Sequence, residues 1–163
     1  MPKLVFFCGK MAAGKTSASR KIKADLSAIL IPEDDWLAKL YPKEIKTFYD
    51  YIHYSARLKS VMTDHIRNLM DVAVNIVLDF PANTINQRLW FKDLLQGSGY
   101  DHELLYLEAD NDVCLQRLRK RRMEQPQRQD FDTEEVFNQV TSYFQAPTLD
   151  EGFNINVIKQ NTA

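Results

Sequence analysis

The chain has 163 residues, of which 45% are hydrophobic and 26% are charged, and its formal net charge is -1. This length and composition are those of one globular domain with a sizeable core, and they exclude a fibrous or low-complexity chain. Because the net charge is close to zero, no global field attracts the chain to nucleic acid or to an anionic membrane, although a local basic patch remains compatible with it.

The N-terminal segment and the cysteines indicate the compartment in which the protein works. The apolar run at residues 4–8 is too short for a signal peptide or a membrane span, so we expect a cytoplasmic protein. Cys8 lies in this run and Cys114 lies in a helical pattern, without the spacing of metal ligands. We therefore expect both residues to be reduced thiols in the core.

The first half of the chain alternates between two periodicities. Residues 3–7 form a continuous apolar run, which is typical of a strand buried on both faces of a sheet. Residues 15–30 repeat apolar side chains at helical spacing, and a short strand predicted over 28–32 overlaps the end of that helix. The aromatic-rich segment 41–54 has two interpretations, a cover over a substrate or helix packing. Residues 57–73 then predict a long amphipathic helix.

The second half continues this alternation. A strand, a helix and a strand are predicted over residues 74–80, 84–96 and 103–109. Asp110 or Asn111 can then cap a helix that runs to about Arg122.

The C-terminal segment predicts one more helix and one more strand. Asp132 is followed three residues later by Glu135, which resembles a capping box and predicts a helix over 132–144. A last apolar strand is predicted over 154–158.

Apolar strands that alternate with helices predict an α/β fold in three layers, with a parallel sheet covered by helices on both faces. Neither a repeat nor a low-complexity segment interrupts the pattern, so residues 1–163 are predicted to form a single domain. Right-handed crossovers place the C-terminal ends of the strands along one edge of the sheet, and ligands of such sheets bind there.

The sequence GKMAAGKT at residues 9–16 fits the pattern G-x-x-x-x-G-K-[ST] of a phosphate-binding P-loop. It follows an apolar strand and precedes an amphipathic helix, which is the context that the motif requires. A loop around a phosphate must point several backbone N–H groups inward, and its glycines permit the unusual dihedral angles. We predict that ATP contacts Gly9, Lys10, Met11, Ala12, Ala13, Gly14, Lys15, Thr16 and Ser17.

Two side chains of this motif carry the expected chemistry. Lys15 is predicted to contact the β- and γ-phosphates as a compact positive charge. The hydroxyl of Thr16 is predicted to bind Mg²⁺, which keeps most of its shell as water and phosphate oxygen.

Two adjacent carboxylates, Asp34 and Asp35, follow the second predicted strand and therefore fall at the same sheet edge as the P-loop. Transfer of phosphate to a hydroxyl needs a carboxylate that orients the acceptor and accepts its proton. The alternative is that these residues only cap the helix that follows.

A third carboxylate and two arginines are candidates for the metal and the acceptor. Asp79 ends an apolar strand, as the Walker B acid does, and is predicted to hold the Mg²⁺ shell. Arg57 and Arg88 are candidate cations of the acceptor site, or else ordinary surface arginines.

An arginine-rich segment lies near the C-terminal end of the helix predicted to end at Arg122. Arg117 and Arg121 share one helix face, and Arg128 lies in the polar segment beyond Pro126. Arginines on a closing lid neutralise the charge of a phosphoryl-transfer transition state, and closure excludes water. The alternative is a solvated basic helix that contacts RNA.

The chain contains neither N-K-x-D nor a D-x-x-G after the third strand, so a guanine-specific GTPase is not expected. It resembles the small P-loop kinases of the AAA_33 type, a group similar to polynucleotide kinase, chloramphenicol phosphotransferase, gluconate kinase and the zeta toxins. The segments that carry the resemblance are GKMAAGKT, EDDWLAKLYP, NIVLDFPANTINQR, LLYLEADNDVCLQRLRKRR and YFQAPTLDEGFNI.

The resemblance implies a P-loop NTPase fold with strand order 2-3-1-4-5 and a lid at about residues 122–132. It implies that Asp34 binds the acceptor, that Asp79 is the Walker B acid and that Arg117 lies near the adenine. The arginines that match the lid positions are Arg121, Arg122 and Arg128. The segment LDFPANT departs from several relatives, so the resemblance does not transfer the substrate of any one of them.

Together these features predict an ATP- and Mg²⁺-dependent phosphotransferase that acts on the hydroxyl of a small molecule, with Lys15, Asp34, Asp35, Arg121 and Arg122 as catalytic residues. The alternatives are an ATPase or nucleotide switch with a protein partner, and a kinase of nucleic-acid 5' ends. We expect a monomer or weak dimer without a membrane partner.

Overall fold

A computed structural model describes residues 2–160 of the chain, so residues 1 and 161–163 of the predicted single domain lie outside the described part. Five parallel strands form one sheet in the order β2-β3-β1-β4-β5. This order and the parallel pairing confirm the predicted fold. The strands are β1 (Lys3–Cys8), β2 (Ile29–Pro32), β3 (Ile76–Pro81), β4 (Asp101–Ala109) and β5 (Ile155–Gln160).

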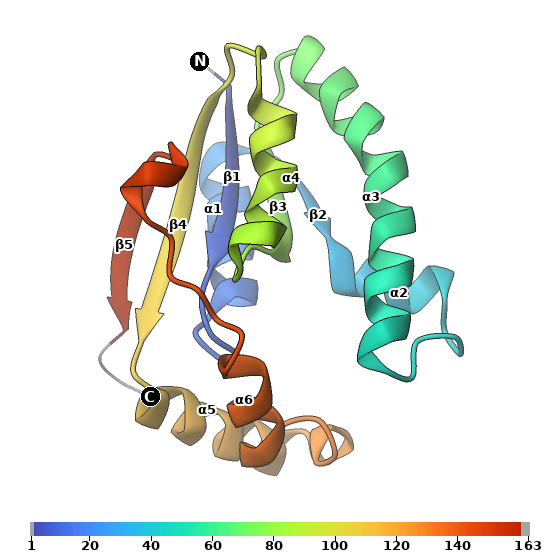
Figure 1. Ribbon diagram of the computed structural model, residues 1–163, viewed down its shortest axis with the longest axis vertical. Helices are drawn as coiled ribbons and strands as arrows, with labels where there is room; N and C mark the ends of the chain where they lie inside the picture. Colours follow the sequence, from blue (N-terminus) through green and yellow to red (C-terminus); the bar gives the residue numbers. More distant parts are fainter. Residues whose placement is uncertain (1, 161–163) are drawn as a thin grey trace.

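Helices cover both faces of this sheet, as Figure 1 shows. Alternate residues of β1 point to opposite faces. Leu4 and Phe6 are buried in the core shared with α3 and α4, whereas Val5 and Phe7 pack toward α1. The helices are α1 (Lys15–Leu26), α2 (Glu33–Leu40), α3 (Phe48–Asp71), α4 (Ile85–Leu95), α5 (Asn111–Glu124) and α6 (Glu134–Thr141), with short 3₁₀ turns η1 (Pro126–Arg128) and η2 (Leu149–Glu151). None of the helices within residues 2–160 is both long and apolar enough to cross a membrane.

Two helix boundaries differ from the predicted ones because of local capping. Helix α1 ends at Leu26, since Ser27 adopts a left-handed conformation with φ of 50° and the chain then enters β2. Helix α3 begins at Phe48, because Thr47 and Asp50 form a reciprocal capping box. The aromatic-rich segment therefore supplies the first turns of α3, where Tyr54 packs against Tyr41 with ring centroids 4.2 Å apart.

The predicted N-cap at Asp132 is wrong. Thr133 caps α6 instead, with its hydroxyl accepting from the N–H of Val136. The side chain of Asp132 is completely buried and accepts hydrogen bonds from Arg121 and Arg128. Two guanidinium partners stabilise the carboxylate more than one backbone N–H would, so Asp132 is held by the arginines and the cap passes to the next residue.

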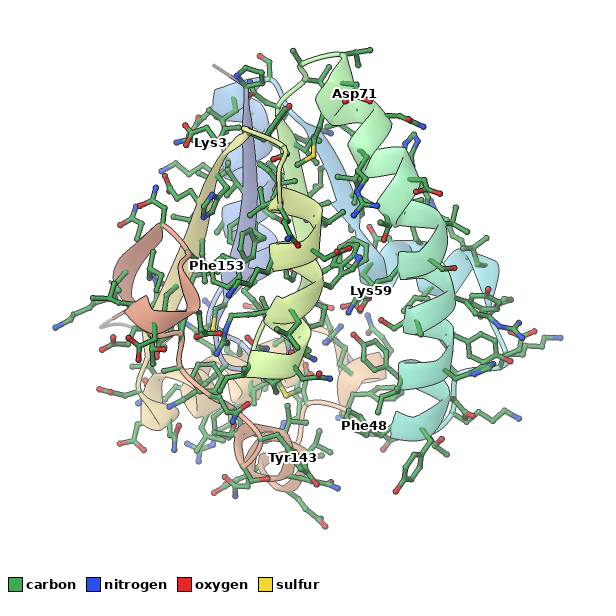
Figure 2. The ribbon with its side chains drawn as sticks, turned by 45° about the horizontal axis from the view of Figure 1, so that its top comes forward. Lys3, Phe48, Lys59, Asp71, Tyr143 and Phe153 are labelled. Atoms are coloured by element: carbon green, nitrogen blue, oxygen red, sulfur yellow. The ribbon has the colours of Figure 1, made fainter. Side chains whose placement is uncertain are left out.

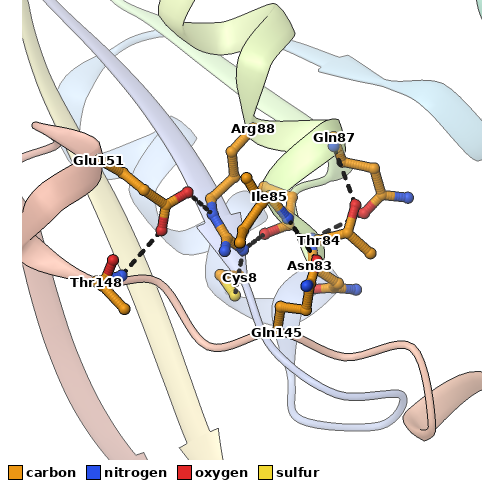
Figure 3. Close-up of polar contacts among 10 residues, drawn as sticks. Cys8, Asn83, Thr84, Ile85, Gln87, Arg88, Gln145, Thr148 and Glu151 are labelled. Carbon is orange, nitrogen blue, oxygen red and sulfur yellow. Dashed lines mark hydrogen bonds and ion pairs between the residues drawn. The ribbon is translucent and has the colours of Figure 1, made fainter.

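A buried arginine joins α4 to the segment before β5 (Figure 3). Arg88 is 1% exposed, and its Nε lies 2.7 Å from Oε1 of Glu151. Its Nη1 donates to the carbonyl oxygen of Ala82 at 2.8 Å and lies 4.0 Å from Sγ of Cys8. The other oxygen of Glu151 accepts from the N–H of Thr148, so this carboxylate is bound from two sides.

We predict that Glu151→Ala lowers the free energy of unfolding by about 3–5 kcal/mol, because it leaves the charge of Arg88 buried without its counter-ion. Urea unfolding at neutral pH measures the change. The matched control is Asp150→Ala, which removes a carboxylate from the exposed neighbouring position. Equal stability of the two variants would contradict a structural role for the Arg88–Glu151 pair.

Candidate active site

The P-loop spans the turn between β1 and α1, and two of its residues have left-handed backbones. Gly14 has φ of 102° and precedes the first turn of α1, and Ala12 has φ of 64°. The N–H of Ala13 donates to the carbonyl of Lys10 at 3.0 Å. Thr16 and Ser17 are exposed at the N-terminus of α1. The loop therefore presents small residues and a helix N-terminus, which together favour an anion.

The first glycine of the loop is fixed by its neighbours. A Cβ at Gly9 would lie 3.0 Å from the carbonyl oxygen of Leu107 and 3.2 Å from Cβ of Ala13, so only glycine fits without movement. The N–H of Gly9 donates to Oδ1 of Asn83 at 2.9 Å. Asn83 in turn accepts from the N–H of Gln145 through its carbonyl oxygen. Asn83 was not predicted from the sequence, because the motif does not record which residue meets the loop from the β3–α4 turn.

A cavity of about 400 Å³ lies beside the loop and has the size of a small-ligand pocket. Arg117 lines it and donates to the carbonyl oxygen of Ala12 at 3.3 Å and to Oε1 of Gln160 at 3.2 Å. The predicted position of Arg117 beside a nucleotide is compatible with this geometry. The other side chains and backbone that line the cavity are those of Gly14, Ser17, Ala18, Lys21 and Leu107.

Lys15 lies among carboxylates at the C-terminal edge of the sheet. Burial lowers the pKa of Lys15, and the nearby Cys8, Asp79 and Asp34 oppose this shift. Burial raises the pKa of Asp34, with Lys15 opposing it. Burial also raises the pKa of Asp79, and Lys15 again opposes the shift. These mutual effects mean that the structure brings Lys15, Asp34 and Asp79 together, although they come from three separate segments.

The carboxylates of this edge suit a divalent cation. Asp34 and Asp35 each raise the pKa of Asp79 by like-charge repulsion, after the larger effect of burial. A bound cation relieves such repulsion. Mg²⁺ uses few protein ligands and takes the remainder from water and phosphate, so Asp79 and the exposed Thr16 hydroxyl are compatible with its shell. Within residues 2–160, no group of three or more His, Cys, Asp or Glu side chains is arranged to hold a metal ion by itself.

The acidic pair lies inside α2 and not at its cap. Pro32 occupies the N-cap position and pairs in register with Asp79, so α2 starts directly beside the end of β3. Asp34 and Asp35 are exposed in the first turn of the helix. Their interpretation as N-cap residues is therefore wrong. Glu33, which the sequence analysis did not single out, is fully buried in the same turn.

The predicted lid arginines divide into two groups. Arg121 and Arg128 each make two hydrogen bonds to Asp132, with the shortest contacts at 2.6 Å and 2.8 Å. Arg128 also lies close enough to Asp34 to lower the pKa of that carboxyl. Arg122 lines a separate cavity of about 610 Å³ with Arg119, Met123, Gln129 and Asp130.

The two predicted acceptor cations lie in different environments. Arg57 is exposed, and its guanidinium carbon lies 5.7 Å from the ring centroid of Tyr54. Arg88 is buried in the pair with Glu151, so the surface-arginine interpretation of Arg88 is wrong. Nη2 of Arg88 is a buried donor with no hydrogen-bond partner within the described residues.

Comparison with known proteins places the chain in a family. The sequence matches the AAA_33 family, described as an AAA domain, over residues 4–147. The chain belongs to this family. Comparison with curated proteins gives no match.

Solved structures with the same fold include nucleotide-binding proteins. An APS kinase of Mycobacterium tuberculosis in complex with AMPPNP and APS is 17% identical, with a TM-score of 0.65 over 98% of this chain and 88% of its own. Kti12 of Chaetomium thermophilum in complex with ADP-AlF3 is 11% identical, with a TM-score of 0.67 over 96% and 88%. A gluconokinase of Sinorhizobium meliloti is 13% identical, with a TM-score of 0.63 over 97% and 82%. At these identities the likeness concerns the fold.

We predict that Asp132→Asn lowers the free energy of unfolding by about 3 kcal/mol at pH 7, because it removes the counter-charge of two arginines. Burial alone would raise the pKa of Asp132, but hydrogen bonds from Arg121 and Arg128 hold it below its usual value. A depressed pKa stabilises the fold above the unfolded-state pKa, about 3.9, and this stabilisation is lost as the pH falls through the folded-state pKa. The difference between wild type and variant should therefore shrink below about pH 4.

Urea unfolding between pH 3 and pH 7 measures this difference. Asp130→Asn makes the same change at an exposed neighbouring carboxylate and serves as the control. A pH-independent difference between wild type and Asp132→Asn would show that the carboxylate charge is not what holds the arginines.

Proposed function

We propose that the protein is an ATP- and Mg²⁺-dependent phosphotransferase that transfers the γ-phosphoryl group to a hydroxyl of a small molecule. The observation that carries this proposal is the cluster of a desolvated Lys15 with Asp34 and Asp79 at the end of a P-loop. A phosphoryl transfer needs a cation on the phosphate, a metal-holding acid and an acceptor-facing acid in one place.

The nucleotide would bind across the loop and the cavity beside it. Its phosphates would accept hydrogen bonds from the backbone N–H groups of the loop and of the N-terminus of α1. Its base would occupy the cavity lined by Arg117, Leu107 and Gln160. Thr16 and Asp79 would hold Mg²⁺, which would stabilise the negative charge of the transferred group.

The acceptor would approach from the side of α2. Asp34 lies in the first turn of α2, and burial of its carboxyl raises its pKa, which suits a carboxylate that accepts a proton from a hydroxyl. Asp35 adds negative charge beside it. Asp34 is therefore the proposed acceptor-facing carboxylate.

The lid arginines would act on the transferring phosphoryl group. Arg128 is close to Asp34, and Arg128 and Arg121 both pair with the same carboxylate, Asp132. Bidentate pairing fixes the planes of both guanidinium groups, so each can present a remaining N–H to an anion without first losing side-chain freedom. Arg122 would contribute only after movement of the lid, since it lines a separate cavity.

We predict that Lys15→Ala lowers acceptor-stimulated ADP production at least about 100-fold, because it removes a preorganised cation from the transferring phosphate.

We predict that Asp34→Asn lowers the same activity about 100- to 10,000-fold while leaving the affinity for Mg·ATP almost unchanged, because a general base acts after the nucleotide is bound. ADP release against a panel of hydroxyl compounds and calorimetry of Mg·ATP binding measure the two effects.

Asp64→Asn, which removes an exposed carboxylate from α3, is the matched control and should behave as the wild type does. Full activity of Lys15→Ala would contradict the proposal. Slow ATP loss that no hydroxyl compound stimulates, and that Asp34→Asn does not alter, would support a nucleotide switch instead. A steep loss of acceptor binding with added salt would indicate a nucleic-acid end as the acceptor.

A further inference from the structure

A lysine of α3 lies beside the proposed acceptor side of the site and has no assigned role. Figure 2 shows Lys59 in the region between α3 and α4. Its Nζ lies 5.3 Å from the ring centroid of Trp90, a residue of α4. The indole of Trp90 is itself held in place, because its Nε1 donates to the hydroxyl of Thr63 at 2.9 Å. The ammonium therefore lies against a fixed aromatic face.

The carboxylate of Glu33, whose charge acts on Lys59, does not pair with this ammonium. The two oxygens of Glu33 accept hydrogen bonds from the hydroxyls of Tyr51 and Ser55, both on α3. Glu33 influences Lys59 through its charge but makes neither a hydrogen bond nor an ion pair with it. Within residues 2–160, Nζ of Lys59 makes no hydrogen bond to another residue, and it is not one of the fully buried polar atoms, so its donors can meet a ligand from solvent.

The half-buried ammonium of Lys59 is only partly hydrated and has donors that no other residue uses. Burial lowers the pKa of Lys59, and the charge of Glu33 opposes this shift. Loss of hydration without compensating hydrogen bonds costs free energy, and an anion that approaches Nζ recovers it. The cation–π contact with Trp90 supplies part of the lost solvation but takes none of the donors.

Lys59 lies on the side of the site from which the acceptor is proposed to approach. Glu33 directly precedes Asp34, and the charge of Glu33 acts on both Lys59 and Lys15. Lys59 therefore lies on the α2–α3 side of the acidic pair. The cavity beside Arg117, where the nucleotide base is proposed to bind, is lined by different elements.

We propose that Lys59 binds an anionic group of the acceptor, a carboxylate, sulfate or phosphate, while the body of the acceptor lies against Trp90. The word acceptor rests on the proposed phosphotransferase function, but the anion site itself does not. The acceptor class is then a hydroxyl compound that carries a negative charge. A neutral sugar or alcohol would leave the ammonium unsatisfied.

The experiment uses Lys59→Met, which keeps the apolar stem and removes the charge. Calorimetry in the presence of Mg·ADP compares pairs of similar size: gluconate with glucitol, glucose 6-sulfate with glucose, and ribose 5-phosphate with ribose. In wild type, the charged member of at least one pair should bind about 10- to 100-fold more tightly than its neutral partner. Lys59→Met should abolish that preference, and the pair that shows it identifies which anion is recognised.

Three further variants separate an anion site from a structural effect. Lys120→Met removes an exposed lysine of α5 and should keep the preference. Lys59→Arg keeps a cation and should retain part of the preference. If Lys59→Met fails to fold, Lys59→Gln replaces it, because Gln keeps a donor without the charge.

The inference is wrong if no charged compound binds more tightly than its neutral partner in wild type, or if Lys59→Met lowers charged and neutral binding equally. The second result would mean that Lys59 serves only as a counter-charge for Glu33. Anion binding that depends on Lys59 without any ADP production would preserve the inference and contradict the phosphotransferase. If a neutral hydroxyl compound is phosphorylated and Lys59→Met leaves that activity unchanged, the phosphotransferase proposal is supported and the inference about Lys59 is wrong.

Discussion

Parallel pairing of the central strands is the constraint on which the rest of this structure depends. Because β2, β3 and β1 run in the same direction, their carboxyl ends meet at one edge of the sheet. Pro32 lies opposite Asp79 in register, so the acidic turn of α2 starts where β3 ends. The P-loop leaves β1 at the same edge. Residues 15, 34 and 79 are therefore brought together by strand direction alone, before any side chain interacts.

Burial then sets the chemistry of that edge. Burial disfavours the charged forms of Lys15, Asp34 and Asp79. The charge of Lys15 partly offsets this cost for the two carboxylates, and their charges partly offset it for Lys15, whereas Asp34 repels Asp79. Such a cluster is less stable than an apolar one of the same size, and perturbed titratable groups gather at functional sites for this reason. The proposed nucleotide and metal would add the charges that complete the cluster.

Two fully buried carboxylates support this edge from outside. Glu33 joins α2 to α3 through Tyr51 and Ser55, and Asp132 joins α5 to the segment before α6 through two arginines. Both have hydrogen-bond partners, as a buried polar group requires, but only Asp132 is paired with cations. Glu33 lies next to an exposed carboxylate in sequence, so adjacent acids in one helical turn have opposite environments.

The sequence by itself determined the strand–helix alternation, the P-loop and the sheet edge at which Asp34 and Asp79 meet, because these follow from periodicity and from backbone rules that act over a few residues. Tertiary structure alone decided the surroundings of Asn83, Lys59, Arg88 and Asp132. Asn83 meets Gly9 across 74 residues, and Arg88 meets Glu151 across 63. Whether a polar side chain is solvated, paired or left with unused donors depends on which distant segment packs against it, and no local pattern records that packing.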